Sequence, residues 1–173
     1  MPVYFWNDPD GSKYHKAYFE VYPNIWHHGD YVVISEQGGV TMYGRSDATL
    51  NPGGVRIGTA EIYSIVENLI EIEDSVIVGQ QWHGDERVVL FIKLKPGISL
   101  DDNLVKKISS NIRAGCSPRH VPALIKEVND IPYTLNGKKV EVAVKKIIHG
   151  EEVQNRDALR NPESLEQFKG ILE

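Results

Sequence analysis

The organisation of this chain turns on the stretch GRSDATLNPGGVRIGTAEI, residues 44–62. It holds four glycines, one proline and two arginines in nineteen positions, directly before an amphipathic pattern. Glycine and proline allow tight bends and a close approach of backbone to a ligand, and guanidinium groups suit anions. The stretch therefore predicts a turn-rich segment that handles a nucleotide or a phosphate.

Downstream of this stretch the pattern predicts a compact α+β unit. Apolar residues recur at helical spacing from Ile62 to Leu69, and Glu61 lies in the first turn, where the helix dipole favours a carboxylate. Two β-branched runs follow, at 75–79 and 87–94, separated by a polar turn. They predict a central antiparallel pair of strands.

The rest of the unit repeats this alternation. Ser99 and Asp102 resemble a helix-start capping pattern before a second amphipathic helix at 104–112. Residues 121–128 predict a third strand, and 140–148 a third helix ended by His149-Gly150. The order is helix, strand, strand, helix, strand, helix, which predicts a three-stranded sheet flanked by helices.

Upstream, two β-rich runs at 31–34 and 40–43 surround Gly38-Gly39 and predict a hairpin. Two strands alone are marginal in water, so this segment should pack on something else. We expect three parts: residues 1–46, the β-rich end of a larger domain; 47–150, a mobile domain; and 151–173, a charged tail or a short docking helix at 162–172.

Composition limits the class of protein. Nineteen Lys and Arg against twenty-four Asp and Glu give a formal charge of −5, which argues against non-specific binding to nucleic acid or to an acidic membrane. The single Cys116 fits a reducing compartment, and no apolar run approaches the length of a membrane span. A cytoplasmic location is the default expectation.

Three motifs in order resemble those of the adenylate-forming superfamily, which contains acyl-CoA synthetases, peptide-synthetase adenylation domains and luciferases. Gly44-Arg45-Ser46-Asp47 resembles the hinge motif between a large N-terminal and a small mobile C-terminal domain. His28-Gly29-Asp30 resembles the ribose-binding Thr-Gly-Asp, and residues 132–138, PYTLNGK, resemble the lysine motif Pro-Lys-Thr-x-Ser-Gly-Lys. The earlier phosphate loop is missing, so the resemblance implies the C-terminal piece of a longer synthetase.

Within the superfamily the sequence is most similar to the acetoacetyl-CoA synthetase subgroup, because Tyr133 and Leu135-Asn136 depart from the usual lysine motif as that subgroup does. The resemblance implies an acid-CoA ligase that uses ATP with Mg²⁺, forms an acyl-AMP, and transfers the acyl group to CoA. The isolated chain should be inactive without its N-terminal domain. A synthetase for acetate or propionate is the alternative inside the class, and a stand-alone α+β binding module the alternative outside it.

The resemblance assigns the adenylation step and the nucleotide to a few residues. Lys138 is the expected catalytic lysine, since an ammonium stabilises negative charge developing on a carboxylate and an α-phosphate. Asp30 and Arg45 are expected to bind the ribose, and Arg56 to be presented to phosphate. Without the resemblance, Lys138 and Lys139 would be surface lysines opening a helix, Asp30 a turn residue and Arg45 a partner in a surface salt bridge. Lys139 keeps that surface interpretation.

The resemblance also assigns the hinge and the CoA contacts. Asp47 is the expected pivot, and Gly54 is expected to line the pantetheine tunnel, where any side chain would obstruct the thiol. Arg113 and, less directly, Arg119 are candidates for the CoA 3′-phosphate; a dipole partner and a loop salt bridge are the alternatives.

Other residues that attract notice receive no ligand role. His27 and His28 are adjacent and lack metal-ligand spacing, so no metal site is expected in this chain. Cys116 has no partner motif for nucleophilic catalysis, and Trp82 is expected to pack or to lie exposed in a turn.

Overall fold

The computed structural model describes residues 2–173, with the Tyr43 side chain left out. By its internal contacts the chain divides into two units, residues 1–30 and 31–173. The predicted domain boundary lies later, at Ser46-Asp47, and stays a prediction about motion rather than about contacts. Each unit is described separately below.

The first unit contains one helix, α1 (Ser12–Tyr18), which the sequence did not suggest because this region was expected to be β-rich. None of its residues is buried. Instead the Asp8 carboxylate accepts hydrogen bonds from the backbone N–H groups of Lys13 and Tyr14, at 2.9 and 2.8 Å. The rings of Phe5, Tyr14 and Tyr18 make edge-to-face contacts with one another and form a small aromatic cluster beside the helix.

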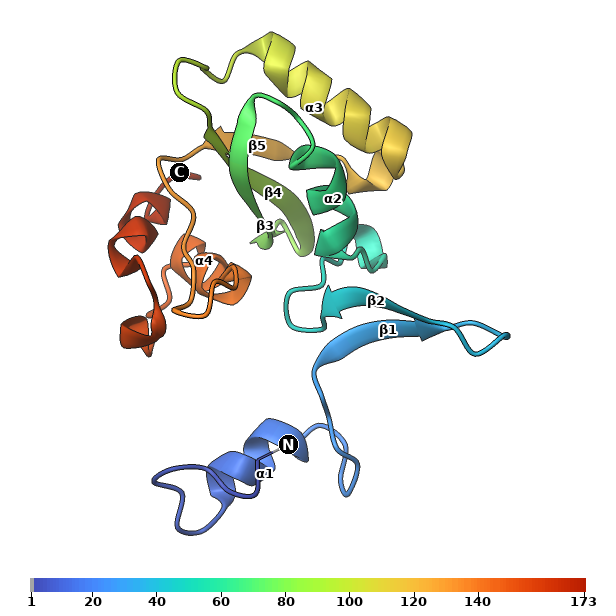
Figure 1. Cartoon of the computed structure of the whole chain (residues 1–173), viewed down its shortest axis with the longest axis vertical. Helices are drawn as coiled ribbons and strands as arrows, with labels where there is room; N and C mark the ends of the chain where they lie inside the picture. Colours follow the sequence, from blue (N-terminus) through green and yellow to red (C-terminus); the bar gives the residue numbers. More distant parts are fainter. Residues whose placement is uncertain (1) are drawn as a thin grey trace. The chain divides into compact units, whose positions relative to one another are not determined.

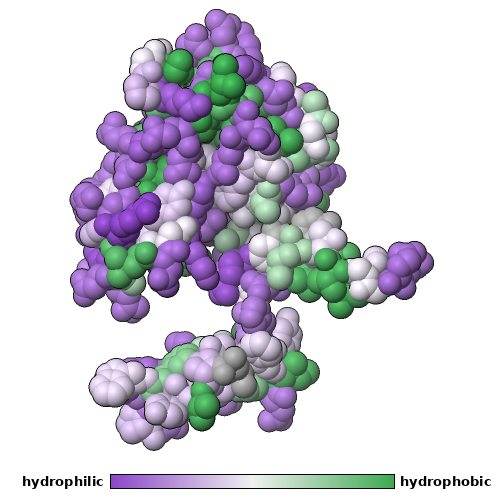
Figure 2. All heavy atoms as spheres, viewed as in Figure 1, coloured by the Kyte–Doolittle hydropathy of each residue, from purple (hydrophilic) through white to green (hydrophobic). Residues whose placement is uncertain are grey.

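The predicted hairpin belongs to the second unit except for Asp30, the first residue of its first strand. Strands β1 (Asp30–Ile34) and β2 (Val40–Arg45) form a two-stranded sheet, closed by a turn at which Gly38 has a φ of 81°. Figure 2 shows an apolar patch on this hairpin, which carries the exposed side chains Val32, Val33, Ile34, Val40 and Met42. A 3-10 turn, η1 (Pro52–Gly54), follows.

The predicted three-stranded sheet is present, in the order β3-β4-β5 (Figure 1). Strands β3 (Ile72–Trp82) and β4 (Asp85–Leu94) pair antiparallel, and β5 (Leu124–Glu127) adds to β4 in parallel. A parallel neighbour requires a crossover connection, and α3 (Asp102–Gly115) with the short turn η2 (Pro118–His120) supplies it. The structure therefore confirms the α+β class.

Alternation along β4 divides the core into two layers, since neighbouring side chains of a strand point to opposite faces. Val88, Leu90 and Ile92 meet α2 (Thr59–Val66) and α3 on one face. Val89 and Phe91 meet α4 (Glu141–Ile148) and the C-terminal segment on the other. Figure 1 shows α2 and α3 on one side of the sheet and α4 on the other.

The start of α3 and the C-terminal segment differ from what the sequence predicted. The N-cap of α3 is Asp101, whose carboxylate accepts from Leu104 N at 2.8 Å, and not Ser99. Residues 151–173 contain two 3-10 turns, η3 (Arg156–Ala158) and η4 (Pro162–Phe168). Leu165 and Phe168 are fully buried, and the Phe168 ring stands edge-on to Phe91 at 5.0 Å between centroids. This segment is therefore part of the core.

Candidate functional site

Lys138 lies at the end of a tight loop that the sequence motif closes on itself. Thr134 N donates to Lys138 O at 2.8 Å, Gly137 N donates to Thr134 O at 2.9 Å, and Lys138 N donates to the Thr134 hydroxyl at 3.0 Å. Gly137 has a φ of 74°, a left-handed conformation for which glycine is best suited. The Lys138 side chain is exposed, and its ammonium makes no ion pair within residues 2–173.

Its neighbour Lys139 behaves in the opposite way, so the expectation of a surface lysine was wrong. The Lys139 side chain is 17% exposed and pairs with Asp74 at 2.8 Å and with Glu67. It also donates to the carbonyl of Ser75 at 2.6 Å and lies over the Tyr63 ring. These partners are distant in sequence, and no local pattern marked them. The loop therefore contains one free and one anchored lysine.

The predicted CoA-contacting Gly54 lies in a second loop, at the end of η1. Gly53 and Gly54 have φ values of 58° and 76°, so both use the left-handed region. The backbone of this loop is held by the first two residues of β4: Asn51 N donates to Glu86 at 2.6 Å, and Gly53 N donates to Asp85 at 3.1 Å. A Cβ on Gly54 would meet nothing within 4 Å in the described chain. Any steric demand for glycine there must come from a ligand or another domain.

Arg56 and Arg119 share one groove of about 270 Å³. The groove is lined also by Tyr31, Glu61 and Ser117. The Arg56 guanidinium lies 5.7 Å from the centroid of the Tyr31 ring, which keeps it beside the groove. Two arginines that line one hollow suit an anionic ligand, with Glu61 a local opposing charge.

Arg113 is not part of this groove. It is exposed in the last turn of α3, where a cation complements the helix dipole. The structure therefore brings Arg119, the less direct candidate for the CoA phosphate, to Arg56, and leaves Arg113 apart. The CoA roles of Arg113 and Arg119 stay predictions.

At the predicted hinge, Arg45 and Asp47 form an ion pair. Arg45 Nε and Nη2 each lie 3.2 Å from an oxygen of the Asp47 carboxylate, in a two-pronged arrangement. The side chains are 56% and 49% exposed, so the pair is open to solvent and adds little to stability. A weak, exposed contact is compatible with a segment that changes its torsions.

Asp30 belongs to the first unit in the contact division. Its carboxylate pairs with His28 Nδ1 and is 17% exposed. The histidine of the ribose-like motif therefore contacts the carboxylate that was expected to bind the ribose.

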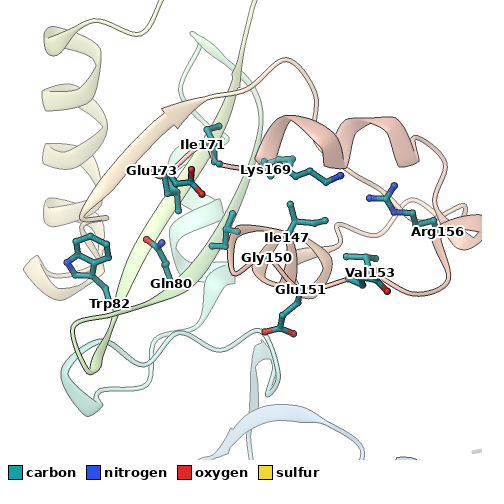
Figure 3. Close-up of a pocket in the computed structure, with 15 residues that line it drawn as sticks. Gln80, Trp82, Ile147, Gly150, Glu151, Val153, Arg156, Lys169, Ile171 and Glu173 are labelled. Atoms are coloured by element: carbon teal, nitrogen blue, oxygen red, sulfur yellow. The ribbon is translucent and has the colours of Figure 1, made fainter.

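Another hollow, of about 810 Å³, lies between the end of β3, the end of α4 and the C-terminal segment (Figure 3). It contains none of the predicted site residues. Figure 3 shows Trp82 and Gln80 on one wall and Ile171 with Lys169 on another. The Arg87 guanidinium covers the Trp82 ring at 3.6 Å, so Trp82 packs under a cation.

Other chemistry is limited in the described residues. Burial raises the pKa of the Cys116 thiol, and Glu61 adds to the shift, so this sulfur is a poor nucleophile. Residues 2–173 hold no group of three His, Cys, Asp or Glu side chains arranged for a metal ion. None of the helices described is long and apolar enough to cross a membrane.

Comparisons with known proteins agree with the motifs. The acetoacetyl-CoA synthetase of Danio rerio is 56% identical over 175 residues, covering all of this chain and 26% of that protein. The acetoacetyl-coenzyme A synthetase of Rhizobium meliloti (strain 1021) is 54% identical over 173 residues, covering all of this chain and 27% of that protein. No protein-family model matches.

Solved structures extend the likeness to the fold. The acetoacetyl-CoA synthetase from Streptomyces lividans matches with a TM-score of 0.89 and 44% identity, over 98% of this chain and 26% of that one. An ATP-bound RpMatB-BxBclM chimera matches with a TM-score of 0.66 and 20% identity, over 83% of this chain and 28% of that one, which shows a shared fold alone. This chain thus spans about a quarter of the relatives that it matches. Over its whole length the chain is similar to the C-terminal part of acetoacetyl-CoA synthetases.

Proposed function

We propose that this chain is the C-terminal part of an ATP-dependent acetoacetyl-CoA synthetase. In the proposed first step the carboxylate of acetoacetate attacks the α-phosphorus of ATP, giving acetoacetyl-AMP and pyrophosphate. In the second step the CoA thiol attacks the acyl carbon, giving acetoacetyl-CoA and AMP. The identity of 54–56% with acetoacetyl-CoA synthetases over the whole chain supports this proposal.

The observation that carries the proposal is the free ammonium of Lys138 on a rigid loop. Negative charge spreads over the phosphoryl oxygens as the acyl carboxylate attacks, and a preorganised cation there lowers the barrier. Lys138 supplies that cation when the domain closes over the nucleotide. Mg²⁺ would be held by the phosphates of ATP and would neutralise part of their negative charge.

The second step uses the other loop. Gly54 lines the path of the pantetheine arm, and Arg113 or Arg119 contacts the 3′-phosphate of CoA. Asp30 and Arg45 hold the ribose of the nucleotide, and Arg56 its phosphate. Rotation about Asp47 brings the Lys138 loop and then the Gly54 loop to the same large domain, a lid motion with a task on each face.

Other readings have less support. Solved structures of other synthetases match at only 17–24% identity, which is the level of a shared fold. A synthetase for acetate or propionate is therefore not favoured, and neither is a stand-alone binding module. The cytoplasmic location, and the lack of nucleic-acid or membrane partners, stay predictions from composition.

Two variants of the complete synthetase test the division of labour. Lys138→Ala should abolish acetoacetate-dependent ATP–pyrophosphate exchange and spare thioester formation from supplied acetoacetyl-AMP. Gly54→Leu should show the opposite pattern, because its side chain obstructs the thiol path. The loss in Lys138→Ala should reach about 100-fold or more, the scale of removing one preorganised electrostatic contact. Equal loss of both half-reactions in either variant would refute the assignment, and turnover by residues 1–173 alone would refute the need for a partner domain.

A further inference from the structure

A polar network under the Lys138 loop has no assigned role. It joins Lys139 and Tyr133 of the loop to Asp74 and Ser75 of β3 and to Glu67, which follows α2. The Tyr133 hydroxyl donates to Asp74 Oδ2 at 2.7 Å, and the Lys139 ammonium lies 2.8 Å from Asp74 Oδ1. One carboxylate thus binds a residue near the start of the loop and a residue directly after Lys138.

The network is directional, because each donor has a defined acceptor. The Lys139 ammonium contacts Asp74, Glu67 and the Ser75 carbonyl, which accounts for its three N–H donors. The Ser75 hydroxyl donates to Glu67 at 3.3 Å and so fixes that carboxylate too. A saturated ammonium cannot be shared with a substrate without breaking one of these bonds.

A second layer supports the first. The Lys139 ammonium lies 4.5 Å from the centroid of the Tyr63 ring, a cation–π distance. The Tyr63 hydroxyl donates to Glu141, the first residue of α4, at 3.1 Å and accepts from Ile77 N at 3.1 Å. The loop is therefore tied to α2, to β3 and to α4 through side chains.

Tyr133 and Lys139 also form the one isolated bridge that closes the loop, residue 133 opposite 139. The five residues between them make the turn whose last member is Lys138. Because both ends converge on Asp74, a shift of either end would move the Lys138 backbone. The exposed Lys138 ammonium itself makes no ion pair within residues 2–173.

From this geometry we infer that Lys139 is a positioning residue: through Asp74 and Tyr133 it fixes the loop that presents Lys138 to the reacting phosphate. The inference rests on the proposed function of Lys138. Lys139 does not touch the substrate; it sets where the neighbouring ammonium stands. Misplacing a catalytic group by about 1 Å can cost about 100-fold in rate.

The test uses the complete synthetase and the two half-reactions separately. Lys139→Met keeps a long apolar stem over Tyr63 and removes the charge; it should lower the kcat of acetoacetate-dependent ATP–pyrophosphate exchange at least about tenfold with little change in KM. Thioester formation from acetoacetyl-AMP should stay within about twofold. Lys139→Arg should restore most of the exchange rate, since a guanidinium can also bridge Asp74 and Glu67. Tyr133→Phe, which removes a single hydroxyl, should lower exchange in the same direction and less.

Lys107→Met is the matched control, because Lys107 forms a 2.6 Å ion pair with Glu71 on the α3 side of the domain. It should change neither half-reaction. The double variant Lys138→Ala with Lys139→Met should be no slower than Lys138→Ala alone, since a residue that acts only through Lys138 has nothing left to position. Additive losses would overturn the inference, and so would parallel losses in both half-reactions.

These outcomes also separate the inference from the function on which it rests. If Lys138→Ala abolishes exchange and Lys139→Met does not lower it, the positioning role fails and the proposed function stands. If Lys138→Ala leaves exchange intact, both fail. Thermal unfolding of Lys139→Met and Tyr133→Phe shows whether a loss reflects folding, and a large drop in both half-reactions together with the melting temperature would count against positioning.

Discussion

The two loops expected to act in turn are held in opposite ways. The Lys138 loop is fixed by side chains that belong to it, Tyr133 and Lys139, reaching inward to Asp74. The Gly54 loop has its backbone held from outside, by the carboxylates of Asp85 and Glu86 on its amides. Glu86 in turn pairs with Lys145 of α4 at 2.8 Å.

The difference follows from what each loop presents. A loop that must leave one side chain free can use the neighbouring side chains as anchors. A loop whose value is a bare backbone cannot, because glycine has no side chain, so its amides must find acceptors elsewhere. The glycine loop therefore depends on carboxylate side chains outside it that accept from its amides, whereas the lysine loop uses its own side chains to reach Asp74.

The largest effect is expected at Glu86. Its side chain is only 7% exposed and binds Asn51 N and Lys145 together. Glu86→Ala leaves both without an acceptor, and we expect the free energy of unfolding to fall by about 2–3 kcal/mol, less than for a fully buried pair because Lys145 is partly exposed. Denaturant unfolding measures this. Glu166→Ala, which breaks only exposed pairs, is the control, and an equal loss there would break the comparison.

A smaller effect is expected at Gly79 of β3, over which the Glu86 side chain lies. A Cβ at residue 79 would overlap the Glu86 carboxyl group. Gly79→Ala should therefore displace this carboxylate from the Gly54 loop and cost about 1–3 kcal/mol. In the double variant Gly79→Ala with Glu86→Ala, the total loss of unfolding free energy should be smaller than the sum of the two single losses. Removing the Glu86 side chain also removes the clash with the new Cβ. Fully additive losses would show that Gly79 matters for another reason.

The smallest effect concerns the support of the lysine loop and appears only at alkaline pH. Burial, followed by the Glu141 charge, raises the pKa of Tyr63 well above its ordinary value of 10.0. A phenol with a raised folded-state pKa contributes stability fully below about pH 10 and loses it as the pH rises through the folded-state value. The free energy of unfolding, measured from pH 8 to 11, should fall less steeply with pH in Tyr63→Phe than in the unmodified protein. Tyr4→Phe, at an exposed site, should keep the original slope, and equal slopes in all three proteins would contradict the prediction.

Elements with periodic apolar residues could be predicted from the sequence, and those held by polar contacts could not. Ile62 and Val66 of α2, and Val88 to Ile92 of β4, are buried as their spacing indicates. Helix α1 buries no residue and depends on Asp8, five and six positions before the amides that it caps, so no hydrophobic pattern revealed it.

The candidate site also has a part that could be predicted from the sequence and a part that could not. Motif resemblance predicts roles for Lys138 and Gly54, and both residues lie exposed on loops. It did not find Asp74, Glu86 or the anchoring of Lys139, because these contacts join residues 35 to 72 positions apart. The polar run that ends in Asp85-Glu86 predicts a solvated turn, and only the fold shows that these residues begin β4 with the Glu86 carboxylate buried.

The docking of the C-terminal segment has a consequence for how the domain is made. Val89 and Phe91 become covered by Leu165 and Phe168, which are synthesised more than seventy residues later. At about 5–20 residues per second of elongation, one face of the sheet stays open for several seconds while its other face can already pack on α2 and α3. During that interval the nascent chain exposes a strip of apolar strand surface, and its safe completion depends on residues that carry no chemistry.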